Sequence, residues 1–270
     1  MTGLRVCHLY PEHLNIYADR GNIAVLRSRC EWRGIGFEAI ACGPGDALPD
    51  ADLYYVGGGQ DRDQLLIADD LVGRTAGLRS AIDAGAWLLA VCGGYQMLGH
   101  YYRGHRGEEM RGTGLVDLVT EAGETRMIGN IVVDCELRPG EPMTVVGFEN
   151  HAGRTRLGDG VRPLGRVLHG HGNNGRDGGE GVHHGRILGT YIHGPLLPKN
   201  PALADLLIVE ALRRRHGAVD LEPLDDRLET TAHGVAVGIA ARYAGRRRRT
   251  SAMPKPLGRL APSRKNPARS

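Results

Sequence analysis

Lysine is nearly absent from this chain of 270 residues. Only Lys199, Lys255 and Lys265 occur among its 34 basic residues, so arginine supplies most of the positive charge. None of the three lysines follows a glycine, and the P-loop pattern GxxxxGK[ST] occurs nowhere. Because that loop is a common cradle for nucleotide phosphates, we expect no ATP site of this kind on the chain.

Paired cysteines and long apolar runs are also missing. The five cysteines, at positions 7, 30, 42, 92 and 135, form no CxxC pair, which argues against a zinc site or a disulfide framework. No apolar run approaches the length of a membrane span, and the first residues lead directly into a strand-like segment. We therefore expect a soluble, cytoplasmic protein without a bound metal.

The net charge of +3 comes from the C-terminal end. Residues 246–270 hold nine basic and no acidic residues, and the rest of the chain has 25 basic against 31 acidic residues, a net charge of −6. This acidic body argues against a nucleic-acid-binding protein. We predict one domain over residues 1–245 and a disordered basic tail over 246–270, for which contact with an anionic membrane or a nucleic acid is the alternative to a solvated tail.

Strand-like and helix-like segments alternate along most of the chain. Apolar runs at 4–10, 37–42, 52–56, 86–91 and 187–192 predict strands, and 23–33, 64–83, 201–215 and 224–244 predict helices. This alternation predicts an α/β fold with a mostly parallel central sheet flanked by helices. Shorter strands are expected at 127–136, 143–148 and 165–168.

A segment rich in glycine and histidine, residues 169–186, follows these short strands. Its histidines suggest a metal site. No cysteine or carboxylate cluster accompanies them, so the favoured interpretation is a flexible, poorly packed surface loop.

The most specific local pattern surrounds Cys92. An apolar strand delivers this cysteine to a turn that continues with Gly93 and Gly94, and a helix is expected from about Tyr95. This is the plan of a nucleophile elbow. The N-terminus of the helix would favour the thiolate, and the Gly93 N–H would face a developing oxyanion. The alternative is a buried structural cysteine at a strand end.

A cysteine nucleophile needs a base, and twelve histidines compete for the role. His193 follows the predicted strand 187–192, just as Cys92 follows its own strand. Because parallel strands end at one edge of a sheet, these two side chains can meet across 101 positions. The alternative, a histidine that caps a loop, has equal weight from spacing alone.

Three consecutive glycines, Gly57, Gly58 and Gly59, end the strand that precedes the Cys92 strand in sequence. Beside a nucleophile elbow, such a loop can supply a second N–H to an oxyanion. A phosphate-binding loop is the alternative.

Six segments together resemble one known family. They are Asn-Ile-Tyr-Ala-Asp-Arg-Gly-Asn at 15–22, Gly-Gly-Gly-Gln-Asp at 57–61, Val-Cys-Gly-Gly-Tyr-Gln-Met-Leu-Gly at 91–99, Thr-Arg at 125–126, Gly-Phe-Glu-Asn-His at 147–151, and Gly-Thr-Tyr-Ile-His-Gly-Pro-Leu-Leu-Pro-Lys-Asn at 189–200. The chain resembles class I glutamine amidotransferases of the cobyric acid synthase type over residues 4–243. The first and last segments are narrower and resemble glutaminase subunits of lipid II isoglutaminyl synthases. The resemblance implies a Rossmann-like domain.

The resemblance also implies roles for individual residues. Cys92 becomes the nucleophile and His193 its base, and Arg126 becomes the residue that fixes the glutamine substrate. Without the resemblance, Arg126 would be interpreted as a solvated charge at the start of a strand. The other implied substrate contacts are Gln96 and an oxyanion hole formed by Gly93 with Gly58 or Gly59.

One position departs from the wider superfamily. Many class I amidotransferases have a glutamate two residues after the histidine, where this chain has Pro195. The third catalytic residue is therefore absent or comes from elsewhere. Asp19 is our candidate, and a role for Asp19 in capping a turn or helix is the equally weighted alternative.

The implied function is hydrolysis of glutamine to glutamate and ammonia. By resemblance, a MurT-like, Mur-ligase-like partner subunit would bind ATP and Mg and use the ammonia to amidate the stem peptide of lipid II, in the cytoplasm near the inner face of the membrane. No cofactor is expected on this chain. The alternatives are an amidotransferase for another carboxylate such as a corrinoid, a non-catalytic scaffold, and a cysteine hydrolase of the peptidase type.

Overall fold

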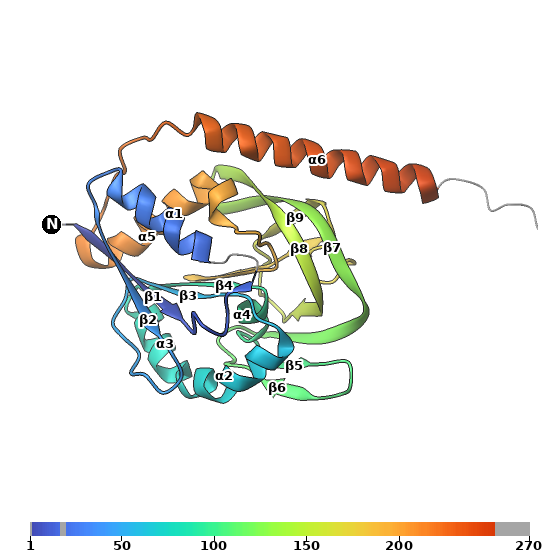
Figure 1. Ribbon diagram of the computed structural model, residues 1–270, viewed down its shortest axis with the longest axis horizontal. Helices are drawn as coiled ribbons and strands as arrows, with labels where there is room; N and C mark the ends of the chain where they lie inside the picture. The colour runs from blue at the N-terminus through green and yellow to red at the C-terminus, as the bar shows by residue number, and fades with distance from the viewer. Residues whose placement is uncertain (1, 17–19, 252–270) are drawn as a thin grey trace, which may run out of the picture.

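The computed structural model describes residues 2–16 and 20–251, with side chains placed as far as residue 242. A six-stranded sheet forms its centre, in the order β11-β12-β4-β3-β1-β2 (Figure 1). The strands are β1 (Gly3–Leu9), β2 (Gly36–Cys42), β3 (Leu53–Val56), β4 (Trp87–Val91), β11 (Val182–His184) and β12 (Ile187–Thr190). All neighbours pair in parallel except β11 with β12. The predicted mostly parallel sheet is confirmed.

Helices cover both faces of this sheet. Figure 1 shows α1 (Arg20–Glu31) and α5 (Pro201–His216) on one face, and α2 (Asp61–Gly73) and α3 (Thr75–Asp83) on the other. Two-sided cover explains why every residue of β3 and β4 is aliphatic or aromatic and buried. The single helix predicted over 64–83 is wrong. It breaks at Arg74, which follows Gly73 and bonds Asp70 and the Gly43 carbonyl.

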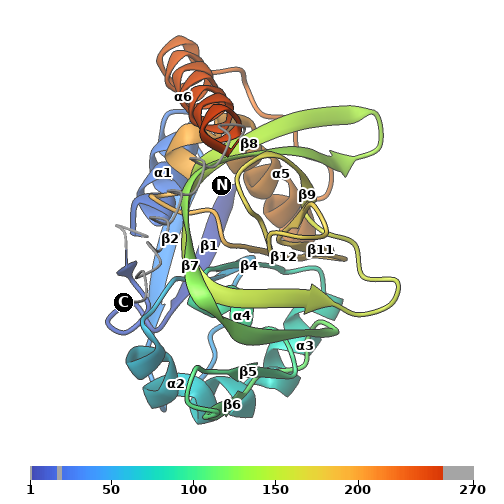
Figure 2. The same cartoon turned by 90° about the vertical axis from the view of Figure 1, so that its right-hand side faces the viewer.

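A second, mainly antiparallel sheet lies against the first. Its strands are β5 (Tyr101–Arg103), β6 (Glu109–Arg111), β7 (Leu118–Arg138), β8 (Glu141–Leu157), β9 (Gly165–His169) and β10 (Gly179–Glu180). Figure 2 shows β7 and β8 as one long, curved hairpin beside the central sheet. These strands extend far beyond the predicted ranges 127–136 and 143–148. The predicted ranges were too short because the outer parts of both strands are polar and show no apolar run.

The histidine- and glycine-rich segment 169–186 is not the loosely packed loop that we predicted. It contains β10 and β11, and Asn173 and Glu180 are fully buried within it. The Asn173 side chain bonds both the N–H and the carbonyl of Gly181. Its glycines permit left-handed backbone, as at Gly172 (φ 67°), which is why a glycine-rich stretch folds tightly here.

Helix α6 (Arg227–Ser251) lies across the outer face of the β7–β8 hairpin (Figure 1). Ala240 packs on Val132 and Val146, a cross-strand pair, while the neighbouring Ile131 and Val145 face the main core. The helix continues past Arg246, where we expected the disordered tail to begin, and residues 252–270 lie outside the described part. No helix within the described residues has the length and apolarity needed to cross a membrane.

Candidate active site

Cys92 directly follows β4 and adopts a backbone conformation that is rare for a residue with a side chain, with φ 52° and ψ −108°. Only 6% of its surface is exposed. The strained turn and the glycines after it are the features of a nucleophile elbow. The helix that follows, α4 (Gly93–Gln96), is a single turn, so the expected contribution of a helix dipole to the thiolate is small.

His193 reaches the same edge of the sheet from the neighbouring strand. β12 pairs in parallel with β4, and Thr190 lies opposite Val91, so both strands end at the same level. His193 is 1% exposed, and its backbone exchanges two hydrogen bonds with Phe148 of β8, at 3.0 and 3.1 Å. Burial, together with the charges of His151 and Arg126, lowers the pKa of His193 to about 4. The imidazole is therefore neutral near pH 7.

The glycine loop after β3 lies against the turn after Cys92. The Gly94 N–H donates to the Gly57 carbonyl at 3.1 Å. A Cβ added at Gly93 would lie 3.1 Å from the Gly59 nitrogen, so these two glycines are in close contact. Within the described residues, no acceptor bonds the N–H of Gly59 or Gly93. Two neighbouring N–H groups beside a cysteine are what an oxyanion hole requires.

A cleft of about 740 Å³ opens in front of Cys92. Four of the predicted site residues line it, namely Gly59, Cys92, Gln96 and Arg126. Gly58, Gly93 and His193 are buried and do not line the cleft. Asp19 lies outside the described residues. The structure thus gathers four of the predicted residues, far apart in sequence, around one opening.

Arg126 reaches the cleft from the irregular part of β7. The pairing of β7 with β8 shifts between Ala122 and Met127, and such a bulge re-aims side chains. The guanidinium donates to the Asn150 side-chain oxygen and to the Asn150 carbonyl, both at 2.8 Å. Asn150 therefore orients an exposed guanidinium group at the mouth of the cleft.

Gln96 belongs to a buried chain of hydrogen bonds. Its oxygen accepts from Gln64 at 3.3 Å, and its amide nitrogen donates to the Tyr191 hydroxyl at 3.3 Å. Tyr191 continues to Thr155 at 2.7 Å, and Thr155 to Thr120 at 2.8 Å. This chain joins the central sheet to the β7–β8 hairpin and fixes the Gln96 side chain.

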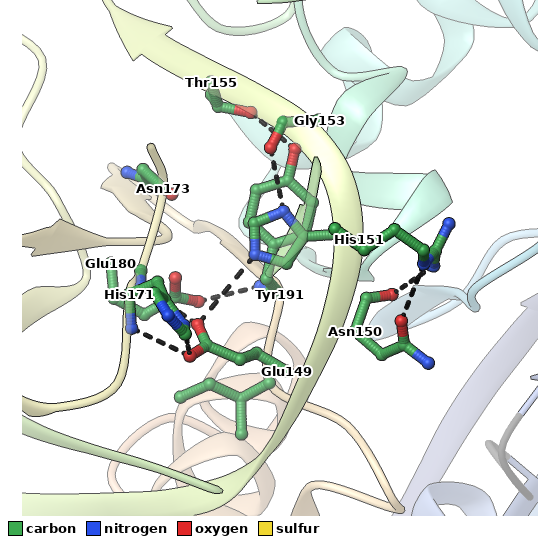
Figure 3. Close-up of polar contacts among 12 residues, drawn as sticks. Glu149, Asn150, His151, Gly153, Thr155, His171, Asn173, Glu180 and Tyr191 are labelled. Atoms are coloured by element: carbon green, nitrogen blue, oxygen red, sulfur yellow. Dashed lines mark hydrogen bonds and ion pairs between the residues drawn. The ribbon is translucent and has the colours of Figure 1, made fainter. Parts of the chain in front are cut away.

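His151, on β8, also lines the cleft, and sequence reasoning assigned it no role. Its ring stacks on Tyr191 with centroids 3.6 Å apart and planes 5° apart, and Nδ1 lies 2.9 Å from the Gly153 carbonyl (Figure 3). Glu149 lies on its other side, 3.9 Å from Nε2. The only signal in the sequence is the Gly-Phe-Glu-Asn-His segment at 147–151, one of the six that carry the family resemblance.

Two carboxyl groups behind His151 are fully buried and behave differently. Although burial acts in the opposite direction, the nearby His151 ring and the hydrogen bonds from His171 and Gly172 lower the pKa of Glu149 to about 2. Burial raises the pKa of Glu180 to about 7. The Glu180 carboxyl accepts from the Thr190 hydroxyl and the Tyr191 N–H, so it anchors the segment that leads to His193.

In the part of the chain that is described, no group of three histidine, cysteine or carboxylate side chains is arranged so that it could hold a metal ion, so nothing there supports the metal-site alternative for segment 169–186. Instead, His171 donates to Glu149 at 2.7 Å. Cys92, Gly59 and Arg126 line the cleft, and the Gly93 N–H and the neutral His193 imidazole are buried at the same edge of the sheet. This arrangement suits attack on an amide of a substrate that bears a carboxylate.

Residues 5–201 match the CobB/CobQ-like glutamine amidotransferase domain. The chain belongs to the CobB/CobQ-like glutamine amidotransferase family. The resemblance seen in the sequence is confirmed by curated relatives. The chain is 38% identical over 244 residues to the GatD subunit of lipid II isoglutaminyl synthase of Staphylococcus aureus, covering 90% of this chain and 98% of that protein.

A second GatD subunit, from Streptococcus pneumoniae, is 38% identical over 79% of this amidotransferase chain and 82% of its own length. Cobyric acid synthase of Pelotomaculum thermopropionicum is 34% identical over 64% of this chain but only 34% of its own length. A solved structure of PurLQS from Thermotoga maritima has a TM-score of 0.51 at 20% identity and covers 78% of this chain and 96% of that one, which supports the fold alone.

Proposed function

We propose that this amidotransferase is the glutaminase subunit of a lipid II isoglutaminyl synthase and hydrolyses glutamine to glutamate and ammonia. The observation that carries the proposal is that the strained Cys92 lines the same cleft as the exposed guanidinium group of Arg126. The names of the two relatives that match most of the chain support the same conclusion.

The reaction proceeds in two steps. His193, which is neutral, takes the proton of the Cys92 thiol, and the thiolate attacks the side-chain carbonyl carbon of glutamine. The N–H groups of Gly93 and Gly59 stabilise the oxyanion. The C–N bond breaks, His193 gives a proton to the departing ammonia, and a glutamyl thioester remains. Water then gives a proton to His193 and attacks the thioester. Glutamate leaves, and the departing sulfur takes the proton from His193, which restores the thiol and the neutral imidazole.

Arg126 gives the site its preference for a free amino acid. A guanidinium pairs in a fork with a carboxylate, and the glutamine α-carboxylate lies at the opposite end of the substrate from the reacting amide. Gln96 completes the substrate contacts. Asp19 remains our candidate for the third catalytic residue that Pro195 cannot supply.

The ammonia has a use only on a second subunit. A MurT-like, ATP- and Mg-dependent partner would activate the α-carboxylate of D-glutamate in the lipid II stem peptide, and ammonia would convert it to D-isoglutamine. The absence of a P-loop from this sequence supports this division of labour. Because lipid II is anchored in a membrane, the complex would work in the cytoplasm at the inner face of that membrane.

The experiment is release of glutamate from glutamine by wild type and by Cys92→Ala, each with and without a co-expressed MurT-like partner. We expect release that depends on Cys92 and increases with the partner. Release that persists in Cys92→Ala would overturn the mechanism. No release from wild type in the presence of the partner would leave only a scaffold.

A further inference from the structure

Gln64 is a buried amide side chain beside the reacting atoms that no motif of the sequence singled out. It lies in the first turn of α2, directly after the glycine loop, and is 1% exposed. Despite its burial, it forms part of the lining of the cleft that contains Cys92. A buried amide must satisfy its polar atoms, so its partners show what it is held for.

The Gln64 amide nitrogen has two acceptors, and both belong to the site. It donates to the Gly59 carbonyl at 3.1 Å and to the Gln96 side-chain oxygen at 3.3 Å. A Cβ added at Gly93 would lie only 2.7 Å from the same nitrogen and 2.9 Å from the amide carbon. One planar group therefore contacts the loop after β3, the turn after β4 and the substrate-binding Gln96.

We infer that Gln64 is a positioning residue for the oxyanion hole, an inference that rests on the proposed glutaminase activity. Gly59 has no side chain, so its peptide groups rotate freely unless a bond restrains them. The bond to its carbonyl fixes the loop where the Gly59 nitrogen lies beside Gly93. The amide of Gln64 also fills the space in front of Gly93. It therefore keeps the N–H groups of Gly59 and Gly93 next to each other.

The same amide sets the orientation of Gln96. Because the oxygen of Gln96 accepts from Gln64, its nitrogen faces the Tyr191 hydroxyl. A carboxylate at position 64 would place a negative oxygen against the Gly59 carbonyl and the Gln96 oxygen, and would drive both away. Among the described residues, no donor bonds the Gln64 oxygen, so its nitrogen is the end that the site uses.

The test compares Gln64→Met and Gln64→Glu with Leu65→Gln, all in the complex with the partner subunit. Methionine keeps the length of the side chain and removes the donor, and glutamate replaces the donor with an acceptor. Leu65 is 54% exposed on the same helix and serves as the control. We expect kcat for glutamine hydrolysis to fall about 10- to 100-fold in both Gln64 variants, since loss of one oxyanion donor costs about 10²–10³.

A second measurement separates positioning from packing. An aldehyde analogue of glutamine, with the side-chain amide replaced by CHO, reacts with the Cys92 thiol: the S–C bond forms, and the carbonyl oxygen takes up the thiol proton or remains an oxyanion. We expect its affinity to fall in parallel with kcat, while KM for glutamine and the affinity for glutamate change by less than about 3-fold. Circular dichroism of each complex reports the folded fraction, so partial unfolding does not obscure the result.

The outcomes divide cleanly. Wild-type kcat and aldehyde affinity in Gln64→Met would overturn the inference and leave the proposed function intact. Equal weakening of aldehyde, glutamine and glutamate would also overturn it, because Gln64 would then shape the pocket rather than the oxyanion hole. A wild-type complex without glutaminase activity would instead refute the proposed function.

Discussion

The two sheets contribute to the cleft in different ways. The parallel sheet delivers the Cys92 thiol and the backbone of Gly59 and Gly93 from the ends of β3 and β4, all buried or nearly so. The antiparallel sheet delivers Arg126 and His151 as side chains from the middle of the long β7–β8 hairpin. In the proposed mechanism, the nucleophile and the oxyanion donors thus come from strand ends, and the contact to the substrate carboxylate comes from a strand surface.

This difference indicates how substitutions in each half of the site should affect catalysis. Atoms at strand ends are fixed by φ/ψ angles and by close backbone contact, so any added atom moves them. Side chains on the hairpin are fixed by neighbours such as Asn150, and a change there weakens one contact. We expect variants of the parallel sheet to lower kcat and variants of the hairpin to raise KM.

The largest effect is expected for Cys92→Ala. Loss of the nucleophile should reduce glutamine hydrolysis below about 0.1% of wild type, because no neighbouring group replaces a thiolate. The measurement is glutamate release in the complex. Circular dichroism and co-purification of the partner should match wild type, and loss of either would show that Cys92 also supports the fold.

Gly93→Ala tests the backbone half of the site. The added carbon would meet the Gln64 amide at 2.7 Å and force the turn away from Gly59, so we expect kcat to fall about 10²-fold. Gly129→Ala on β7 is the matched control, since an added Cβ there meets nothing within 4 Å. Equal losses in both variants would erase the distinction between the two sheets.

Arg126→Lys tests the hairpin half. Lysine keeps the charge but loses the fork geometry, and a charge-assisted hydrogen bond is worth about 1.5–3 kcal/mol. We expect KM for glutamine to rise about 10- to 100-fold with kcat within about 3-fold. A fall in kcat at unchanged KM would place Arg126 in the chemical step instead.

The smallest expected effect concerns how the free energy of unfolding depends on pH. Burial, with a smaller effect of the Arg20 charge, lowers the pKa of His8 to about 4, whereas an unfolded histidine titrates near 6.5. The unfolded state therefore binds the proton first, and stability is lost as the pH falls from 6.5 toward 4. Between pH 6.5 and 5 this amounts to about 2 kcal/mol for one such group.

In His8→Gln, the free energy of unfolding should fall less between pH 7 and pH 5 than in wild type, because the contribution of His8 is gone. Urea unfolding at the two pH values measures this. His193, with its pKa likewise near 4, accounts for a second share that remains. An unchanged pH dependence in the variant would mean that His8 is not the group that titrates. Because His193 stays neutral above pH 4, glutaminase activity should not lose its base between pH 6 and 8.

Sequence reasoning found the elements whose signal is local. The apolar strand before Cys92 and the glycines after it predicted the turn. Two such strand ends made Cys92 and His193 a possible pair, and only the resemblance favoured it over a loop-capping histidine. It missed Gln64 and His151, because a glutamine on a helix and a histidine on a strand look like ordinary polar positions until their neighbours are known. It also underestimated β7 and β8, whose polar outer parts carry no periodic apolar signal.

The sequence by itself determined the chemistry of this protein. A cysteine in a glycine turn after a buried strand, and a histidine after another, follow from short-range backbone rules and from the burial of apolar runs. Only the tertiary structure decided what surrounds them. Three features depend on strand order and packing: the contact of Gly59 with Gly93, the Gln64 amide beside these two glycines, and the bulge that aims Arg126. Each brings together residues whose separation in the sequence gives no sign that they meet.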